Sequence, residues 1–306
     1  MTHAAIMHIS TIVCTRNRPD LIGTALESIL ANDYASYDVL VVDQSTDDRT
    51  SAVVRGLMDT HSNLRYVHTP IAGLSRAYNI GIRESRGELI AFTDDDCVAP
   101  RDWLQSIADE FSGNPDADML YGQVLRPAAL ADCTDIVPTL EFSTPRRFSR
   151  KDGFKVYGMG ANFACRRRLF ERIGYFDEIL GGGGPLRSSQ DFDLQYRAFL
   201  GGTVVLLSPT VKIDHYGVRT RQEWPATERA YGIGDGAFYF KHVRCGDVFA
   251  LWLFARKMVI TSLKDVVRLV RRRPTHTQYV RSCFTGIRMS LRFGVDRGRR
   301  IYQAAA

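Results

Sequence analysis

At 306 residues with 45% hydrophobic side chains, the chain can bury the core of one large domain, or of one domain with an appendage. Six cysteines without a C-x-x-C pair or regular spacing argue against a disulfide framework or a zinc site and indicate the reduced thiols of a cytosolic protein. The formal charge of +6 is uneven: residues 255–306 carry 13 Lys and Arg against 2 Asp, which leaves 27 basic and 32 acidic residues on 1–254.

Strand and helix patterns alternate through the first 93 residues. Apolar, β-branched runs predict strands over 8–15, 37–42, 64–68 and 88–93, and apolar residues at helical spacing predict helices over 21–30, 74–83 and around 53–57. Four strands joined by helices predict right-handed βαβ units. The expected fold class is therefore α/β, Rossmann-like, with a mostly parallel central sheet flanked by helices.

The first turn of this pattern argues against a dinucleotide-binding site. That site needs glycines that let the backbone approach a pyrophosphate, whereas the turn here, Thr15 to Pro19, has none, and no P-loop pattern is present. A bound phosphate would then need a cation or basic side chains to meet its charge.

Three adjacent carboxylates, Asp94, Asp95 and Asp96, end the fourth expected strand. Ligands of open α/β sheets bind beyond the carboxyl ends of the strands. A fold tolerates three neighbouring like charges best when a cation lies among them. The alternative is a solvated acidic loop that caps the helix expected to start near Asp102.

The second half of the chain is less regular. A helix is expected over 103–111 and a strand over 118–125, followed by a long connection over 126–155 that is typical of a lid or substrate loop. Strands are expected over 202–207 and 211–213, and a helix over 228–241.

Three segments follow the first, second and fourth expected strands: Thr15-Arg16-Asn17-Arg18, Val41 to Asp47, and Phe92 to Asp96. Together they resemble the family 2 glycosyltransferases of GT-A fold. The resemblance implies that the strand turn and the Asp after the second strand hold the nucleobase and ribose of a nucleoside diphosphate sugar, here Thr15, Arg16, Asn17 and Asp43.

The Asp triplet is similar to the D-x-D motif of that family. The resemblance implies that Asp94 and Asp95 contact the donor and that Asp94 and Asp96 bind a divalent metal, Mn²⁺ or Mg²⁺. Arg76 stands where some members place a base-contacting Arg; a solvated helix Arg is the alternative. For Asp43 the alternative is a helix-capping carboxylate.

Two later segments resemble the same family. These are Gly158 to Phe163 and Gly174 to Glu178. Together they are similar to the segment that lines the sugar and acceptor site of the family, and the resemblance implies that Asn162 contacts the sugar. Asn can donate to and accept from hydroxyl groups, although such glycines also mark plain turns.

Gln190 to Arg197 is similar to the E-D-x-D-L…R motif of the family, which makes Asp191 the general base of an inverting enzyme. Ser189 is expected to cap this helix, and the alternative role for Asp191 and Asp193 is to complement the helix dipole. Gln190 replaces the Glu of the motif, which leaves in doubt any role of that residue toward the acceptor.

His215 follows the last expected strand, where the family often has a metal-coordinating His; a structural His is the alternative. The resemblance thus implies a metal-dependent, inverting glycosyltransferase of hexosyltransferase type, which moves a sugar to an acceptor hydroxyl in polysaccharide or glycolipid synthesis. A nucleotidyltransferase and a non-catalytic nucleotide-sugar-binding relative are the competing hypotheses.

The basic tail has an apolar run over 248–260 and then arginines interleaved with apolar residues, including Arg271 to Arg273. Such helices are typical of anionic membrane surfaces. No nucleic-acid motif accompanies the charge; packing on the body or in a homo-oligomer is the third alternative. We predict neither a spanning helix nor a signal peptide, since no run of 18 apolar residues exists and residues 1–7 lack the required pattern.

The expected organisation is a glycosyltransferase domain over 1–245, with a nucleotide-sugar half over 8–125 and an acceptor and catalytic half over 156–240, and a basic amphipathic tail over 246–306. The expected location is the cytoplasm, peripheral at the inner face of the plasma membrane, with a saccharide or lipid-linked acceptor.

Overall fold

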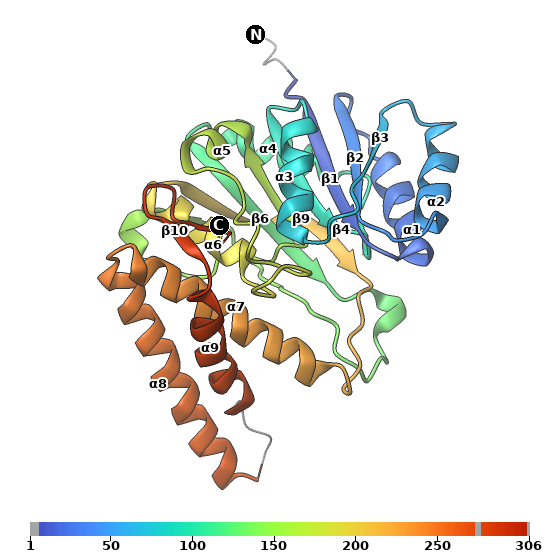
Figure 1. The fold of residues 1–306 in the computed structure, drawn as a ribbon. Helices are drawn as coiled ribbons and strands as arrows, with labels where there is room; N and C mark the ends of the chain where they lie inside the picture. Colours follow the sequence, from blue (N-terminus) through green and yellow to red (C-terminus); the bar gives the residue numbers. More distant parts are fainter. Residues whose placement is uncertain (1–5, 273–276, 305–306) are drawn as a thin grey trace. The chain divides into compact units, whose positions relative to one another are not determined.

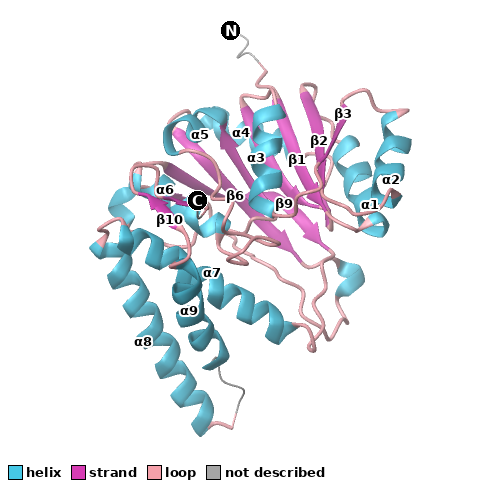
Figure 2. Ribbon diagram, viewed as in Figure 1, coloured by secondary structure: helices cyan, strands magenta, loops and turns pink. Residues whose placement is uncertain are grey.

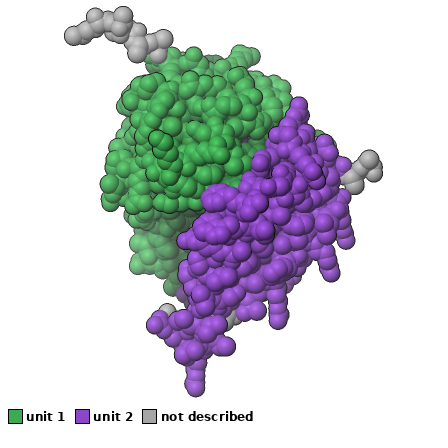
Figure 3. Space-filling model, turned by 90° about the vertical axis from the view of Figure 1, so that its left-hand side faces the viewer, with its two compact units in different colours: residues 1–72, 77–175, 195–219 green, residues 73–76, 176–194, 220–306 purple. Residues whose placement is uncertain are grey.

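The structure is a computed structural model that describes residues 6–272 and 277–304, so Arg273 of the basic tail lies outside the described residues. The chain divides into two compact units (Figure 3). Unit 1 comprises residues 1–72, 77–175 and 195–219, and unit 2 comprises residues 73–76, 176–194 and 220–306. Helices α3 (Leu74–Glu84) and α6 (Gln190–Leu200) each contribute residues to both units.

Unit 1 is built on a mixed sheet of nine strands within the described residues (Figures 1 and 2). Strands β3, β2, β1 and β4 are adjacent and parallel, as the βαβ pattern predicts. Beyond β4, β8 runs antiparallel to both of its neighbours, while β9 is parallel to β6. The strands are β1 (Ile9–Thr15), β2 (Tyr37–Asp43), β3 (Leu64–His68), β4 (Leu89–Asp94), β5 (Cys97–Val98), β6 (Ala117–Leu125), β7 (Arg146–Phe148), β8 (Asn162–Arg166) and β9 (Val204–His215).

Alternate residues of the parallel strands pack on opposite faces of the sheet, as the two-residue period of a strand requires. Val39 and Val41 of β2 belong to one hydrophobic cluster, and Leu40 and Val42 belong to another. Helices of unit 1 cover these faces: α1 (Pro19–Leu30), α2 (Arg49–Met58), α3 (Leu74–Glu84), α4 (Trp103–Gly113) and α5 (Arg167–Ile173).

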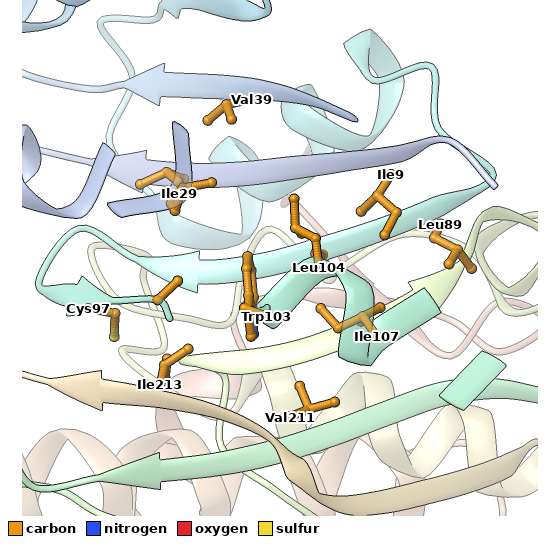
Figure 4. Close-up of a cluster of buried hydrophobic side chains, with 14 of the residues drawn as sticks. Ile9, Ile29, Val39, Leu89, Cys97, Trp103, Leu104, Ile107, Val211 and Ile213 are labelled. Carbon is orange, nitrogen blue, oxygen red and sulfur yellow. The ribbon is translucent and has the colours of Figure 1, made fainter. Parts of the chain in front are cut away.

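The larger cluster receives apolar residues from α1, α2 and α4 (Figure 4). Trp103 of α4 is fully buried and belongs to the same cluster as Ile213 of β9. The opposite face receives Ala77 of α3, and an aromatic stack joins Phe92 of β4 to Phe163 of β8 at 4.3 Å between ring centroids. The prediction of an α/β fold with a mostly parallel central sheet is confirmed.

Three details of unit 1 differ from the predicted elements. The two strands expected over 202–207 and 211–213 form one strand, β9, because a register shift against β6 absorbs Pro209. The two-residue strand β5, which was not predicted, pairs with the end of β9. The long connection over 126–155 contains the short strand β7 and two short helices, η1 (Ala128–Leu130) and η2 (Arg150–Asp152).

Unit 2 contains the start of α6 (Gln190–Leu200) and the helices α7 (Trp224–Arg244), α8 (Val248–Val270) and α9 (Thr277–Ser290). A small hairpin, β10 (Gly294–Asp296) and β11 (Ile301–Gln303), follows α9. Helices α7 and α9 approach closely: a Cβ on Gly236 would overlap the carbonyl oxygen of Cys283, and one on Gly286 would overlap that of Ile233. The glycines are needed at this crossing because no other residue fits there.

Candidate active site

The parallel strands of unit 1 bring three of the predicted polar residues to one edge of the sheet. Thr15 at the end of β1 is in register with Asp43 at the end of β2, and Cys14 is in register with Asp94 at the end of β4. This is the carboxyl edge, at which ligands of open α/β sheets bind. The position of these residues follows from the strand order.

The Asp triplet is held by the turn after β1. The hydroxyl of Thr15 donates to Asp95 Oδ2 at 2.7 Å. The guanidinium of Arg18 donates to Asp95 Oδ1 at 2.5 Å and to Asp96 Oδ2 at 3.0 Å. Asp95 and Asp96 are each 4% exposed, so these bonds meet charges that are largely removed from water. The triplet is therefore not the solvated loop of the alternative interpretation.

Strand β5 brings His215 to the same group, which we call the carboxylate cluster: Asp94, Asp95, Asp96, His215, Cys97 and Arg18. Cys97 is in register with His215, and the backbone N–H of Tyr216 donates to the carbonyl of Asp96 at 2.8 Å. His215 Nε2 lies 3.4 Å from Asp96 Oδ1. Four possible ligand atoms lie within 4.8 Å of one another, one each from Asp94, Asp96, Cys97 and His215.

Two buried atoms of the carboxylate cluster have no hydrogen-bond partner among the residues that the structure describes. They are Asp96 Oδ1 and His215 Nδ1, both from side chains that are at least nine-tenths buried. Buried polar atoms are nearly always hydrogen-bonded, so such exceptions call for an explanation. Carboxylate and imidazole atoms are ligands of divalent transition metals, and the donor set fits such an ion.

The pKa values of the carboxylate cluster reflect crowded negative charge. Burial, and then the neighbouring carboxylates Asp96 and Asp95, raise the pKa of Asp94 to about 7. Burial alone would lower the pKa of Arg18, but the charges of Asp95 and Asp96 outweigh it and raise that pKa. Burial lowers the pKa of His215, which favours the neutral imidazole that a metal requires.

The other residues of unit 1 that were predicted to contact the nucleobase and ribose form a second group beside the turn after β1. Asn17 adopts a positive φ of 55°; its N–H donates to Ser45 Oγ and its side-chain oxygen accepts from Thr46 N, both at 2.8 Å. Asp43 is fully buried and accepts from Ser45 N and from the hydroxyl of Tyr66, each at 2.8 Å. Arg16 is exposed. A pocket of about 270 Å³ lies beside this group, lined by Ser45, Thr46, Asp47, Asp48, Ser51, Arg55, Tyr66 and His68.

Asn162 lies in the core of unit 1. Its side-chain nitrogen donates to the carbonyls of Gln123 at 2.8 Å and Val211 at 3.2 Å, and its oxygen accepts from Trp103 Nε1 at 3.0 Å. The side chain is 0% exposed. These bonds join β6, β8, β9 and α4, so they give Asn162 a structural role. The predicted contact of Asn162 with the sugar stays a prediction, which these bonds do not support.

Unit 2 carries the other two predicted site residues, Arg76 and Asp191. Arg76 Nη2 forms a 3.1 Å ion pair with Glu178 Oε2, and both side chains are partly exposed. Asp191 lies at the start of α6 and is partly exposed. Desolvation of its carboxyl is the main cause that raises its pKa to about 6, and the charge of Asp235 acts in the same direction. Such a pKa suits a base that works near neutral pH.

Asp193, two residues after Asp191 in the first turn of α6, has a different environment. It belongs to what we call the buried ion cluster: Asp177, Asp193, Lys241 and His242. Lys241 Nζ lies 2.6 Å from both Asp177 Oδ2 and Asp193 Oδ1, and His242 Nε2 lies 2.9 Å from Asp193 Oδ1. All four side chains are fully buried. Asp193 therefore fastens α6 to α7, which leaves Asp191 as the carboxylate available for chemistry.

Two expectations about these residues need correction or addition. Ser189 was expected to cap α6, but its hydroxyl donates to Asp235 of α7 at 2.7 Å, and its backbone has a positive φ of 68°. Sequence reasoning also missed Arg18 and Lys241. A lysine inside the apolar run of α7 is the signal for a buried ion pair, whereas Arg18 follows a turn and gives no such signal.

Comparison with known proteins identifies the family. The model of the family described as Glycosyl transferase family 2 matches residues 10–174, which are more than half of the chain. The chain belongs to glycosyl transferase family 2. The prediction of a family 2 glycosyltransferase is thereby confirmed at the level of the family.

Similar proteins include a glucosyl-dolichyl phosphate glucuronosyltransferase of Haloferax volcanii, 25% identical over 71% of this chain and 72% of that protein. The glycosyltransferase AglE of the same organism is 30% identical over 38% of this chain and 39% of its own length. The succinoglycan biosynthesis protein ExoM of Rhizobium meliloti is 35% identical over 32% of this chain and 33% of its own. The matches thus span about a third of the last two relatives.

Solved structures share the fold. TarS of S. aureus, residues 1–349, has a TM-score of 0.57 at 20% identity and covers 75% of this chain and 65% of its own. The mannosyltransferase PcManGT of Pyrobaculum calidifontis has a TM-score of 0.61 at 18% identity and covers 94% and 86%. The expected GT-A fold is confirmed.

Proposed function

We propose that this family 2 glycosyltransferase is metal-dependent and inverting, and that it transfers a hexosyl group from a nucleoside diphosphate sugar to an acceptor hydroxyl. The observation that carries the proposal is the group of four possible ligand atoms from Asp94, Asp96, Cys97 and His215, in which the buried Asp96 Oδ1 has no hydrogen-bond partner among the described residues. A buried acceptor without a partner costs free energy unless a ligand meets it.

The residues proposed to hold Mn²⁺ or Mg²⁺ are Asp94, Asp96 and His215, which makes the triplet a D-x-D motif in function. An imidazole beside carboxylates suits Mn²⁺ better than a set of oxygens alone would. When bound, the ion would neutralise negative charge on the diphosphate leaving group. The mannosyltransferase PcManGT, whose structure contains GDP-Man and Mn²⁺, supports this choice of metal and donor class.

The donor is proposed to lie along the carboxyl edge of β1, β2 and β4. Thr15, Arg16, Asn17 and Asp43 would contact its nucleobase and ribose, with Asp94 and Asp95 next to the ribose. Arg18 is an addition to the predicted set, since its guanidinium at the triplet could also meet a phosphate oxygen. TarS structures containing UDP and UDP-GlcNAc support a nucleotide-sugar donor.

Asp191 is proposed as the general base. It removes the proton of the acceptor hydroxyl as the oxygen attacks the anomeric carbon and the bond to the diphosphate breaks on the opposite face, so one displacement inverts the configuration. Asp193 is unsuited to this role because Lys241 and His242 already occupy its carboxylate. Arg76 is retained as a proposed donor contact, with Glu178 as its partner when the donor is absent.

The acceptor is proposed to be a saccharide or a lipid-linked saccharide. Relatives whose names refer to dolichyl phosphate and to succinoglycan biosynthesis support a glycolipid or polysaccharide product. A lipid-linked acceptor would be met at the inner face of the plasma membrane by the basic tail. Among the described residues, no helix combines the length and the apolar character needed to cross a membrane.

The proposal is tested by sugar transfer with the metal removed and restored. Activity should be lost with a chelator and recovered with Mn²⁺. The anomeric configuration of the product, determined by NMR, should be opposite to that of the donor. Retained configuration, or full activity in excess chelator, would refute the mechanism. Donor binding without transfer to any acceptor would favour the non-catalytic relative instead.

A further inference from the structure

Helix α8 carries an apolar stripe that faces water. Val248, Trp252, Val259, Leu263, Val266 and Val270 recur at spacings of three, four and seven residues, which places them along one side of the helix. Each is between 54% and 80% exposed. An amphipathic helix of a globular protein normally turns such a stripe to the core, so in α8 the pattern is reversed.

The opposite side of α8 provides its attachment to unit 2. Ala250 and Leu253 are buried, and Lys257 donates to Asp235 of α7 at 2.5 Å. Asp235 also accepts from the hydroxyls of Tyr279 in α9 and Ser189 before α6. This buried carboxylate fixes the rotation of α8 about its own axis, which keeps the stripe outward. The exposure of the stripe is therefore a built feature of the helix.

The charges beside the stripe limit what can cover it. Helix α8 carries six basic residues, namely Arg256, Lys257, Lys264, Arg268 and, at its end, Arg271 and Arg272, against the single acid Asp265. Two copies of α8 packed together would bring these like charges close, whereas helices that pair carry both signs beside their apolar seam. An anionic surface complements them.

We propose that α8 is a membrane-docking helix whose apolar stripe enters the headgroup region of an anionic bilayer. Trp252 lies at one end of the stripe, with the guanidinium of Arg256 5.8 Å from its ring centroid, and tryptophan favours the interface between lipid and water. Lys264 and Arg271 are exposed and meet lipid phosphates. The inference deepens the proposed function and rests on it only for the acceptor, a lipid-linked saccharide reached at that surface.

The test is co-sedimentation of the full chain with vesicles of phosphatidylcholine, with and without phosphatidylglycerol, in the absence of donor and metal. Wild type should pellet only with the anionic vesicles. The variant V259S/L263S/V266S should bind at least about tenfold more weakly, because it removes apolar area that enters the interface. The variant K264Q/R271Q should lose about fivefold per charge, and high salt should mimic it.

Matched controls separate the stripe from general surface effects. I71S removes an exposed apolar residue of unit 1, and R86Q/R150Q removes two exposed charges of unit 1; both should pellet like wild type. Circular dichroism should show that every variant keeps its helices, because the altered side chains are exposed. Emission from Trp252 should shift to the blue with anionic vesicles, and W252F should lose that shift.

Three outcomes would overturn the inference: wild type that does not pellet with anionic vesicles, stripe variants that pellet like wild type, or a dimer by light scattering that V259S/L263S/V266S dissolves. The last would show that a second copy covers the stripe. None of these outcomes bears on the metal site, because Mn²⁺-dependent donor binding is measured without vesicles.

Discussion

The carboxylate cluster of unit 1 and the buried ion cluster of unit 2 are built from similar residues. They differ in how many of their buried polar atoms have a hydrogen-bond or ion-pair partner. In the buried ion cluster, Lys241 and His242 reach Asp193, and Lys241 and the N–H of Tyr302 reach Asp177. In the carboxylate cluster, Arg18 binds two carboxylates, yet Asp96 Oδ1 and His215 Nδ1 find no hydrogen bond among the described residues.

This difference separates a structural cluster from a ligand site. A buried carboxylate whose oxygens are all used holds elements together, whereas a crowded set with unused atoms can accept a cation. The same contrast separates two carboxylates in the first turn of α6. Asp193 is paired with Lys241 and His242, whereas no described residue forms an ion pair with Asp191.

The largest expected effect is on catalysis. D191N should lower kcat by roughly 10²–10⁴, the usual contribution of a general base, while the affinity for the donor is unchanged. Because the pKa of Asp191 is about 6, the wild-type rate should fall about tenfold per pH unit below that value as the base becomes protonated. Full activity of D191N, or an unchanged profile, would remove Asp191 from the mechanism.

The next effect is on stability. K241M leaves Asp177 and Asp193 buried without their cation, which should cost about 3–5 kcal/mol of unfolding free energy. Urea unfolding measures it, and K151M, at an exposed lysine, is the control, with an expected change within about 0.5 kcal/mol. Equal stability of K241M and K151M would mean that the buried ion cluster is not what fastens α6 to α7.

The third effect is on metal affinity. D96N should weaken Mn²⁺ binding by more than the roughly 10–100-fold that outer partners contribute, as measured by calorimetry. The unfolding free energy without metal should change little, because relief of repulsion from Asp94 and Asp95 offsets the lost attraction to Arg18. D109N alters an exposed carboxylate of α4 and should bind Mn²⁺ like wild type. Equal affinities of the two variants would place the metal elsewhere.

The most gradual effect is a pH dependence of stability at His242. Burial lowers its pKa to about 4, from 6.5 in the unfolded chain, so the unfolded state binds more protons between these values. The stability that wild type has over H242N should therefore shrink as pH falls from about 6.5 to 4, by up to about 1.4 kcal/mol per pH unit. A constant difference across that window would show that His242 titrates normally.

Much of unit 1 could be predicted from sequence because its signals are local. Strand and helix periods predicted the βαβ order, and the parallel order then implied that Thr15, Asp43 and Asp94 share one edge. Contacts between distant segments could not be predicted in this way. The pairing of β5 with β9 depends on a two-residue strand, which is too short to leave a pattern.

The sites were predictable in part for the same reason. Motif resemblance pointed to Asp94–Asp96, His215 and Asp191, but it could not show that Asp43 and Asn162 would be fully buried. Nor could it show that Arg18 would reach the triplet, because Asp95 and Asp96 follow Arg18 by 77 and 78 positions in the sequence. The apolar residues of α8 were visible in the sequence, whereas their outward orientation depends on Asp235 and Lys257.

The most direct test of the central claim is thermal unfolding of the wild-type chain with a panel of nucleoside diphosphate sugars, with Mn²⁺ or with a chelator. One donor should raise Tm only when Mn²⁺ is present, with a stabilisation of about 2.7 kcal/mol at a hundredfold excess over its Kd, and D96N should lose the shift. Stabilisation that is equal with chelator, or absent for every donor with Mn²⁺, would contradict a metal-dependent donor site at the carboxylate cluster.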